Sequence, residues 1–223
     1  MISHAKQYAL ECLGTFILVL LVTGTVVLSE GTGNTPTGGE IALVYGLTLA
    51  ALTAILGKYT GAHLNPAVTL AYSIDGTLSW KQTVPYMLSQ STGALAASTL
   101  LRFLFPNSAS LGALLPVKGD VPTFAQEFTF TLILITGILS VPKDTQQHRR
   151  LSAIVAGTLA ALAIFLTGPL SGSGMNPARA LAPALISGQK DGLWIYLTAP
   201  LCAVSAAAGL HGMYKAMHPE KSS

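Results

Sequence analysis

The sequence predicts an all-α membrane protein with six transmembrane helices and two short re-entrant half-helices. Charged residues make up 9% of the chain and apolar residues 51%, whereas soluble domains carry about 25% charged residues. Long apolar stretches alternate with short polar breaks, and the tripeptide Asn-Pro-Ala occurs once in each half of the chain. These three observations favour a membrane protein with an internal duplication.

Six apolar stretches approach or exceed the roughly 20 residues that a bilayer-spanning helix needs. They are predicted at residues 5–28, 40–56, 83–105, 123–141, 151–167 and 192–214. Polar breaks occur at residues 29–39, 106–122 and 142–150. Because further spans follow the first one, it is not a lone cleaved signal.

The two Asn-Pro-Ala tripeptides predict the starts of two short helices. They are Asn65-Pro66-Ala67 and Asn176-Pro177-Ala178. Asn is a favoured N-cap, and Pro suits the first helical position because its missing N–H had no partner there. Each helix meets a glycine soon afterwards, at Gly76 and Gly188, so neither is long enough to span. They are expected to enter the membrane through irregular backbone, which is tolerated only where protein buries it or where it lines a wet cavity.

A second repeated pattern supports the duplication. Glu11-x-x-x-Thr15 opens the first apolar stretch, and Glu127-x-x-x-Thr131 opens the fourth. Three spans lie between the copies, so the second copy has the opposite membrane orientation, and such folds place their sites near the midplane. We expect a single domain over residues 1–223, with a first repeat at about 1–110 and a second at about 120–217.

The distribution of Lys and Arg predicts a multi-pass protein of the cell membrane with both termini in the cytoplasm. On that orientation the outer segments hold only Arg102, Lys118 and Lys190. The inner segments hold Lys6, Lys58, Lys81, Lys143, Arg149, Arg150, Lys215 and Lys221. This excess follows the positive-inside rule. Basic loops facing anionic lipid account for the net charge of +3, so no nucleic-acid partner is expected.

The sequence offers no pattern typical of an enzyme or of an ATP-driven pump. It has no Cys/His cluster with metal-ligand spacing and no Gly-rich phosphate loop after a strand, so no metal, cofactor or catalytic residue is expected. Cys12 and Cys202 both lie inside apolar stretches and are interpreted as small buried hydrophobic residues.

The two half-helices would bring two positive dipole ends together near the membrane centre. Each N-cap asparagine would use its carbonyl on its own helix and keep its NH2 donors free for a solute. Such a centre would favour neutral hydroxylic solutes and repel cations. At this point the sequence resembles the aquaporin family, also called major intrinsic proteins, which is known by this pair of Asn-Pro-Ala boxes. The resemblance implies an aquaporin-like homotetramer with one pore per protomer that passively conducts water and small uncharged solutes.

Arg179, directly after the second box, is the most conspicuous charged residue. An Arg at membrane depth costs about 2.5–3.5 kcal/mol, and a cation in the first turn of a helix opposes the dipole. A local conflict of this kind points to function, although a side chain reaching a lipid headgroup is the alternative. The resemblance assigns Arg179 to the outer selectivity filter and, by counting back from the boxes, adds Tyr45, Ile164 and Ser173.

The predicted filter indicates the class of solute. Water-selective members of the family have His where this chain has Ile164, and glycerol facilitators have Asp where it has Ala180. An aliphatic Ile164 with the phrase GPLSGSGMNPAR most resembles the nodulin-type branch, which is known for water, glycerol and uncharged metalloid acids. Tyr45 departs from that pattern because its ring could narrow the opening; the alternative is an aromatic residue at the membrane interface.

Glu11 and Glu127 are carboxylates at membrane depth and need partners. They could form a proton relay, which would make the protein an ion-coupled secondary transporter, or they could brace the re-entrant loops. Their repeat symmetry and the lack of a basic partner favour bracing, the role that the resemblance also implies. A non-conducting structural membrane protein is the third alternative. In the channel hypothesis Asn65 and Asn176 donate hydrogen bonds to the solute, and backbone carbonyls accept them at Gly61, Ala62, His63, Gly172, Ser173 and Gly174.

Overall fold

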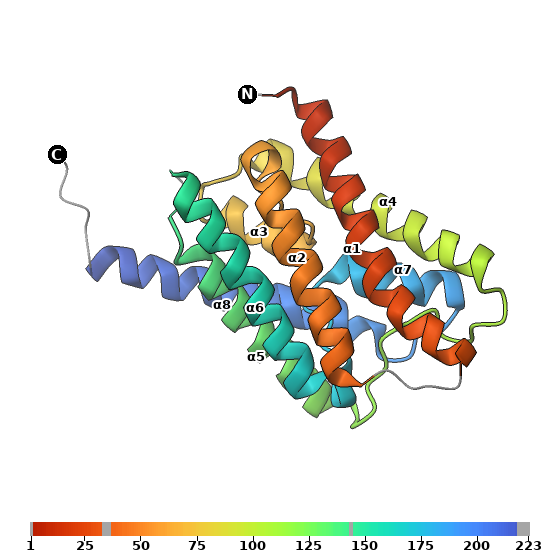
Figure 1. The fold of residues 1–223 in the computed structure, drawn as a ribbon. Coiled ribbons are helices and arrows are strands. Elements are labelled where there is room, and N and C mark those ends of the chain that lie inside the picture. The colour runs from red at the N-terminus through yellow and green to blue at the C-terminus, as the bar shows by residue number, and fades with distance from the viewer. Residues whose placement is uncertain (1, 33–36, 143–144, 218–223) are drawn as a thin grey trace.

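A computed structural model describes residues 2–32, 37–142 and 145–217, and the helices joined by loops in this part of the chain are accompanied by no strand. Figure 1 shows a bundle in which two short helices lie among six long ones. The helices are α1 (His4–Thr32), α2 (Gly38–Thr60), α3 (Pro66–Ile74), α4 (Trp80–Leu104), α5 (Asp120–Leu139), α6 (Gln146–Ser171), α7 (Pro177–Ser187) and α8 (Leu193–Met217). The predicted fold class is therefore confirmed.

The long helices mostly extend a few residues beyond the predicted spans because local chemistry, not the apolar core, sets their ends. The hydroxyl of Thr37 accepts from the backbone N–H of Glu40, and the Glu40 carboxylate accepts from the Thr37 N–H, which starts α2 with a capping box. Helices α2 and α6 end at Gly61 and Gly172, whose φ angles of 84° and 76° are left-handed. Glycine adopts that conformation readily, so each long helix stops where a re-entrant loop begins.

Helix α4 is less apolar than the other long helices. Among the described residues α1, α2, α5, α6 and α8 are long and apolar enough to cross a membrane, and α4 is not among them. Its Ser89, Ser91 and Thr92 hydroxyls donate to carbonyls four residues earlier in the same helix. These hydrogen bonds satisfy the hydroxyl groups within α4, so they need no partner outside the helix. This explains how a long helix can carry many polar side chains here.

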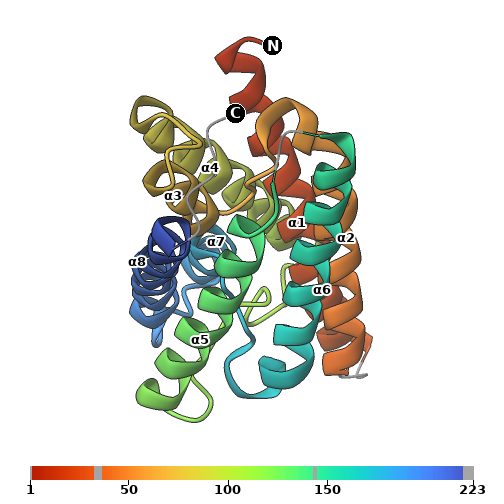
Figure 2. The same cartoon turned by 90° about the vertical axis from the view of Figure 1, so that its left-hand side faces the viewer.

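The two halves of the chain pack in the same way. Helix α1 contacts α2 and α4, as α5 contacts α6 and α8; α4 packs on α7, as α8 packs on α3. Figure 2 shows α2 beside α6, and the short helices α3 and α7 also contact each other. Each of these contacts in the first half, helices α1 to α4, therefore has a counterpart in the second half, helices α5 to α8. The α2–α6 and α3–α7 pairs lie at the interface between the halves.

The contact between α2 and α6 depends on small residues. A Cβ atom added to Gly46 would lie 2.7 Å from the carbonyl oxygen of Gly157 and 2.7 Å from the Cβ of Ala161. A Cβ on Gly157 would lie 2.7 Å from the Cβ of Ala50. Glycine at these positions lets the two backbones approach closely, as small residues do between membrane helices.

The prediction that both cysteines are buried is wrong. Cys202 is exposed on α8, and Cys12 on α1 is only partly buried. Large apolar side chains are also exposed, among them Leu47 on α2, Val84 on α4 and Phe165 on α6. The surface of a membrane protein that faces the bilayer is apolar. A cysteine in an apolar span can therefore lie on that surface as well as inside the bundle.

Three of the lysines expected at the inner face lie near one end of the bundle. Gln7 of α1 donates to the Tyr59 carbonyl at the end of α2, and His4 lies 2.7 Å from Gln82 at the start of α4. These contacts place Lys6, Lys58 and Lys81 near one another in space. Lys143 and Lys221 lie outside the described residues.

Candidate functional site

The N-termini of α3 and α7 meet inside the bundle through their asparagines. The side-chain amide of Asn65 donates to the Met175 carbonyl over 2.8 Å, and that of Asn176 donates to the Leu64 carbonyl over 2.9 Å. Each side-chain oxygen also caps its own helix, accepting from Ala67 N–H at 2.8 Å and from Ala178 N–H at 3.0 Å. One amide hydrogen of each asparagine is thus used on the opposite loop, so the expectation that both NH2 donors stay free is wrong. Asn176 also bonds the Tyr45 side chain.

Glu11 collects hydrogen bonds from the loop between α2 and α3. One carboxylate oxygen accepts from the Thr60 hydroxyl at 2.6 Å and from the His63 N–H at 3.0 Å. The other accepts from the Leu64 N–H and from the Gln90 amide, both at 2.8 Å. Successive backbone N–H groups converging on one anion form a nest, so this side chain fixes the loop.

Glu127 does the same for the loop between α6 and α7. Its two oxygens accept from the N–H groups of Gly174 at 2.8 Å and Met175 at 2.9 Å. Both glutamates are fully buried. With this set of donors around each carboxylate, the bracing hypothesis has direct geometric support, and neither glutamate has an ion-pair partner among the described residues.

These hydrogen bonds orient the loop carbonyls. In a planar trans peptide unit the N–H and C=O groups point in opposite directions. Because the N–H groups of His63 and Leu64 face Glu11, the carbonyls of Ala62 and His63 point away from it. The N–H of Ala62 faces the Thr60 hydroxyl, which turns the Gly61 carbonyl away likewise.

The second loop repeats this orientation. The N–H groups of Gly174 and Met175 face Glu127, and that of Ser173 faces the Ser171 hydroxyl at 3.1 Å. The carbonyls turned away from these groups are those of Gly172, Ser173 and Gly174. Both predicted carbonyl triplets therefore point away from the side chains that hold their loops.

The loops keep this shape at some conformational cost. Ala62, Leu64, Ser173 and Met175 have φ angles between 46° and 51°, a left-handed region that costs a non-glycine residue roughly 1–3 kcal/mol. They occupy matching positions before Asn65 and Asn176. Such residues persist where surrounding contacts hold them, which the two glutamates provide here.

Sequence reasoning missed several residues that hold the loops. Tyr86 donates its hydroxyl to the Thr60 carbonyl at 3.1 Å, and Tyr196 donates to the Ser171 carbonyl at 2.7 Å. Gln90 also donates to the Thr69 hydroxyl at 2.8 Å. The matching position of the two tyrosines in α4 and α8 was a detectable signal, whereas the Gln90 contact depends on how α4 packs on α1.

The four predicted filter residues are all buried, with exposed fractions of 3% or less. Arg179 donates to the Gly112 carbonyl at 3.3 Å, and its Nε has no partner among the described residues. The Tyr45 side chain hydrogen bonds with the side chain of Asn176. Gly112 lies in the loop between α4 and α5 and was not predicted.

A narrow cavity of about 20 Å3 lies beside the two asparagines. That volume holds about one water molecule. Tyr45 and both asparagines border it, whereas Ile164, Ser173 and Arg179 do not. One side is the loop backbone from Gly61 to Asn65, and the other sides carry Leu18, Leu49, Thr53, Val68, Tyr72, Leu134, Ile138, Ser152 and Ala156.

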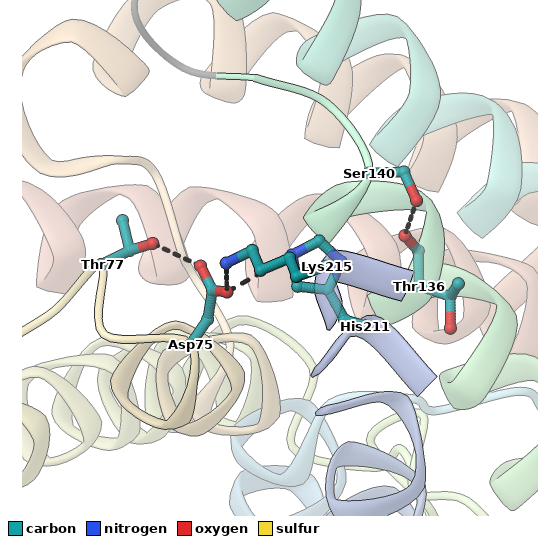
Figure 3. A network of polar contacts seen from close by, with 6 residues as sticks. All are labelled: Asp75, Thr77, Thr136, Ser140, His211 and Lys215. Atoms are coloured by element: carbon teal, nitrogen blue, oxygen red, sulfur yellow. Dashed lines mark hydrogen bonds and ion pairs between the residues drawn. The ribbon is translucent and has the colours of Figure 1, made fainter. Parts of the chain in front are cut away.

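A separate polar cluster ties the end of α3 to the end of α8. Asp75, which follows α3, accepts from Lys215 at 2.7 Å and from Thr77 at 2.6 Å, and lies 3.4 Å from His211 (Figure 3). Burial raises the pKa of Asp75, but the hydrogen bonds from Lys215 and Thr77 and the nearby cations outweigh it, so the pKa lies below its usual value. No group of three His, Cys, Asp or Glu side chains suited to a metal ion occurs among the described residues.

The sequence model of the major intrinsic protein family matches residues 1–211 of this chain. The chain belongs to the major intrinsic protein family. It is accordingly a passive membrane channel for water and small solutes, not an enzyme. The resemblance drawn from the two Asn-Pro-Ala boxes is confirmed over nearly the whole chain.

Several plant proteins are similar to this major intrinsic protein. Aquaporin NIP1-3 of Oryza sativa subsp. japonica is 33% identical over 215 residues, which is 96% of this chain and 75% of that protein. Aquaporin NIP1-1 of Arabidopsis thaliana is 36% identical over 219 residues, 94% of this chain and 74% of that protein. Nodulin-26 of Glycine max is 33% identical over 215 residues, 96% of this chain and 79% of that protein. The likeness to the nodulin-type branch is thus confirmed.

A solved structure shares the fold. The X-ray structure of the aquaglyceroporin from Plasmodium falciparum matches with a TM-score of 0.81 at 22% identity, covering 97% of this chain and 98% of that one. At this level of identity the match supports the architecture alone.

Proposed function

We propose that this protein conducts water together with small uncharged solutes, glycerol and metalloid acids among them, and excludes protons and ions. The observation that carries the proposal is the two-sided inner cavity. Carbonyls turned away from Glu11 offer acceptors on one side, and Leu49, Leu134 and Ile138 form an apolar surface on the other. Such walls suit a solute with hydroxyl groups on one face and carbon on the other.

Tyr45, Ile164, Ser173 and Arg179 are proposed as the outer selectivity filter. Ile164 offers no hydrogen bond, and Arg179 has an unused Nε donor in a buried setting. An unpaired buried donor is unfavourable unless water or a solute supplies an acceptor, which supports a role in contacting the permeating molecule. Tyr45 is the element that restricts solutes larger than water.

Exclusion of cations and protons is proposed to come from three positive features. The N-termini of α3 and α7 carry the positive ends of two helix dipoles, and Arg179 adds a full charge. Asn65 retains one amide hydrogen that can donate to a passing oxygen, whereas the amide of Asn176 bonds both Leu64 and Tyr45. A water whose oxygen accepts hydrogen bonds from these donors has no lone pair left for the next water in the file. It therefore cannot take a proton from that water.

The assembly and setting are also proposals. We infer a homotetramer with one pore per protomer, in the cell membrane, with both termini cytoplasmic. The tetrameric state is inferred from membership of the family. The orientation is inferred from the position of Lys6, Lys58 and Lys81 at one end of the bundle, by the positive-inside rule. The matched packing of the two halves supports one channel domain built from repeats at about 1–110 and 120–217.

Stopped-flow measurements on proteoliposomes test the proposal. Vesicles holding the native protein should show fast water flow and measurable uptake of glycerol or a metalloid acid. Tyr45→Ala should raise glycerol uptake about three- to tenfold and Ile164→His should lower it, since one polar contact is worth about 0.5–1.5 kcal/mol. Leu47→Ala, on the outer face of the same helix, should change neither flux. Fast water flow with no uptake of either solute, unchanged in Tyr45→Ala, would refute the proposed solute range.

A gradient experiment separates the passive channel from an ion-coupled transporter. A pH or sodium gradient should not concentrate glycerol inside the vesicles, because the two buried glutamates are occupied by loop N–H groups and not by an exchanging cation. Accumulation against the glycerol gradient would instead favour coupled transport.

A further inference from the structure

We propose that Thr53 and Ser152 form a binding subsite in the inner half of the pore for small neutral solutes that carry several hydroxyl groups. Both side chains border the cavity from long helices, Thr53 from α2 and Ser152 from α6, and not from its re-entrant loop. This inference rests on the proposed function, because it takes the inner cavity as part of the path of such solutes. The cavity holds about one water molecule, so a larger solute brings one hydroxyl-bearing end into it at a time. Glycerol and trihydroxy metalloid acids share the required chemistry.

The Thr53 hydroxyl is a buried polar group with no partner. Its side chain is 7% exposed and borders the cavity, and its Oγ1 has no hydrogen bond among the described residues. Some helical threonines, such as Thr15, donate to the carbonyl four residues earlier, but Thr53 does not. Thr123, Thr131 and Thr136 also lack a hydrogen bond among the described residues, and of these four hydroxyls that of Thr53 alone belongs to a residue bordering the cavity. Buried hydroxyls are seldom left unsatisfied, so a molecule inside the cavity is the remaining source of a hydrogen bond.

Ser152 brings a second hydroxyl to the same cavity from another helix. It lies near the start of α6, is 8% exposed and borders the cavity as Thr53 does. Gly46 lies against Ala161, and Ala50 lies against Gly157, so α2 and α6 run antiparallel. Continuing that register toward the inner end brings Thr53 of α2 close to the level of Ser152.

The rest of the cavity explains why a polyhydroxy solute gains more from this pair than water does. Around the two hydroxyls the wall is apolar, with Leu49 and Ile138 among its members. A water in a narrow file keeps hydrogen bonds to the waters before and after it. A polyol or a trihydroxy acid replaces those neighbours with its own carbon or metalloid atom, so a hydroxyl turned away from the loop carbonyls needs a partner on the far wall.

The charge of the cavity selects neutral solutes. Among the described residues no Asp, Glu, Lys or Arg side chain borders it, so a charged molecule would lose its hydration with no opposite charge to compensate. The site is therefore suited to neutral molecules with hydroxyl groups on two faces.

The test compares solute and water flux in single variants. Thr53→Val keeps the shape and removes the hydroxyl, Ser152→Ala removes the other, and Thr53→Ser keeps a hydroxyl. In proteoliposomes, Thr53→Val and Ser152→Ala should each lower glycerol and arsenious acid uptake about three- to tenfold, with water flow within about twofold of the native value. Thr53→Ser should stay near native. Thr92→Val, whose hydroxyl is already bonded within α4, is the matched control.

A second measurement follows water flow in the presence of glycerol and needs no variant of Thr53. Isotonic glycerol on both sides of the membrane should slow water flow through the native protein, because an occupied subsite blocks the file, and should slow it less in Ser152→Ala. Unchanged solute uptake in both variants, or an equal fall in water and solute flux, overturns the subsite and leaves the proposed channel standing. A native protein that passes water but neither solute overturns the proposed solute range itself, and with it the subsite.

Discussion

The carboxylate of Glu127 accepts a hydrogen bond from the backbone N–H of Met175 over 2.9 Å. Met175 is a left-handed residue with φ of 49°, and its carbonyl receives the amide of Asn65 from the other half of the chain. The glutamate therefore fixes the residue through which the two half-helices are joined. Glu11 stands in the same relation to Leu64 and Asn176.

Removing one carboxylate oxygen should loosen this junction. In Glu127→Gln an amide NH2 would face either Gly174 or Met175 N–H, leaving a buried donor unpaired. We expect a loss of stability of about 1–3 kcal/mol, measured by thermal unfolding in detergent, together with reduced water flow. Glu40→Gln alters an exposed helix cap and is the control, with a smaller loss of stability and normal flow. A fully stable, fully active Glu127→Gln would contradict the bracing role.

Arg179→Val should let protons or cations leak. The substitution removes the full charge from the proposed filter while leaving the two half-helix ends in place, so water should still pass. The double variant with Asn176→Asp should leak more, because it adds a negative charge and removes a donor at the centre. A pH-sensitive dye inside proteoliposomes measures the leak, and Lys118→Val in the loop after α4 is the control. Background proton conductance in both variants would show the assignment of Arg179 to be wrong.

Mercurials should inhibit the native protein weakly and the Ser173→Cys variant strongly. Cys12 and Cys202 do not border the cavity, and Cys202 is exposed on α8, so a modified native thiol leaves the path open. A thiol at Ser173 would place the reagent in the proposed filter. Water flow with and without mercurial, followed by a reducing agent, measures the effect. Complete block of the native protein would mean that a native cysteine reaches the path.

The ion pair between Asp75 and Lys215 should contribute stability that disappears in acid. Because the folded-state pKa of Asp75 lies below its usual value of about 3.9, the contribution is complete above that value and is lost as the pH falls through the folded-state pKa. At pH 7 Asp75→Asn should be less stable by about 0.2–1 kcal/mol, the range for exposed pairs, and at about pH 3 the difference should shrink.

A double-mutant cycle isolates that pair. Lys215→Gln should cost about as much as Asp75→Asn, and the double variant should cost little more than either, since both remove the same contact. Unfolding temperatures in detergent from pH 3 to pH 7 give the comparison. A stability difference that is independent of pH would indicate that packing around Asp75, not its charge, is responsible.

Much of the architecture could be predicted because its signals are local. Apolar stretches predict spans, Asn-Pro pairs predict helix starts, and the paired Glu11 and Glu127 patterns indicate a duplication. The α4 span shows where such signals weaken, since its polar residues are accommodated by bonds within the helix. Cys202 shows a different failure, because an apolar span does not reveal which of its faces meets lipid.

The two half-helices, their N-caps and the glutamates at matching positions could be predicted from the sequence, because helix starts and apolar lengths depend on neighbouring residues. Three features appear only in the folded chain: Met175 and Leu64 accept from the opposite asparagines, Gly112 accepts from Arg179, and the Thr53 hydroxyl has no partner among the described residues beside the cavity. These contacts join residues far apart in the chain. Their existence depends on how the helices pack, and on left-handed backbone that is stable only once the buried carboxylates hold it.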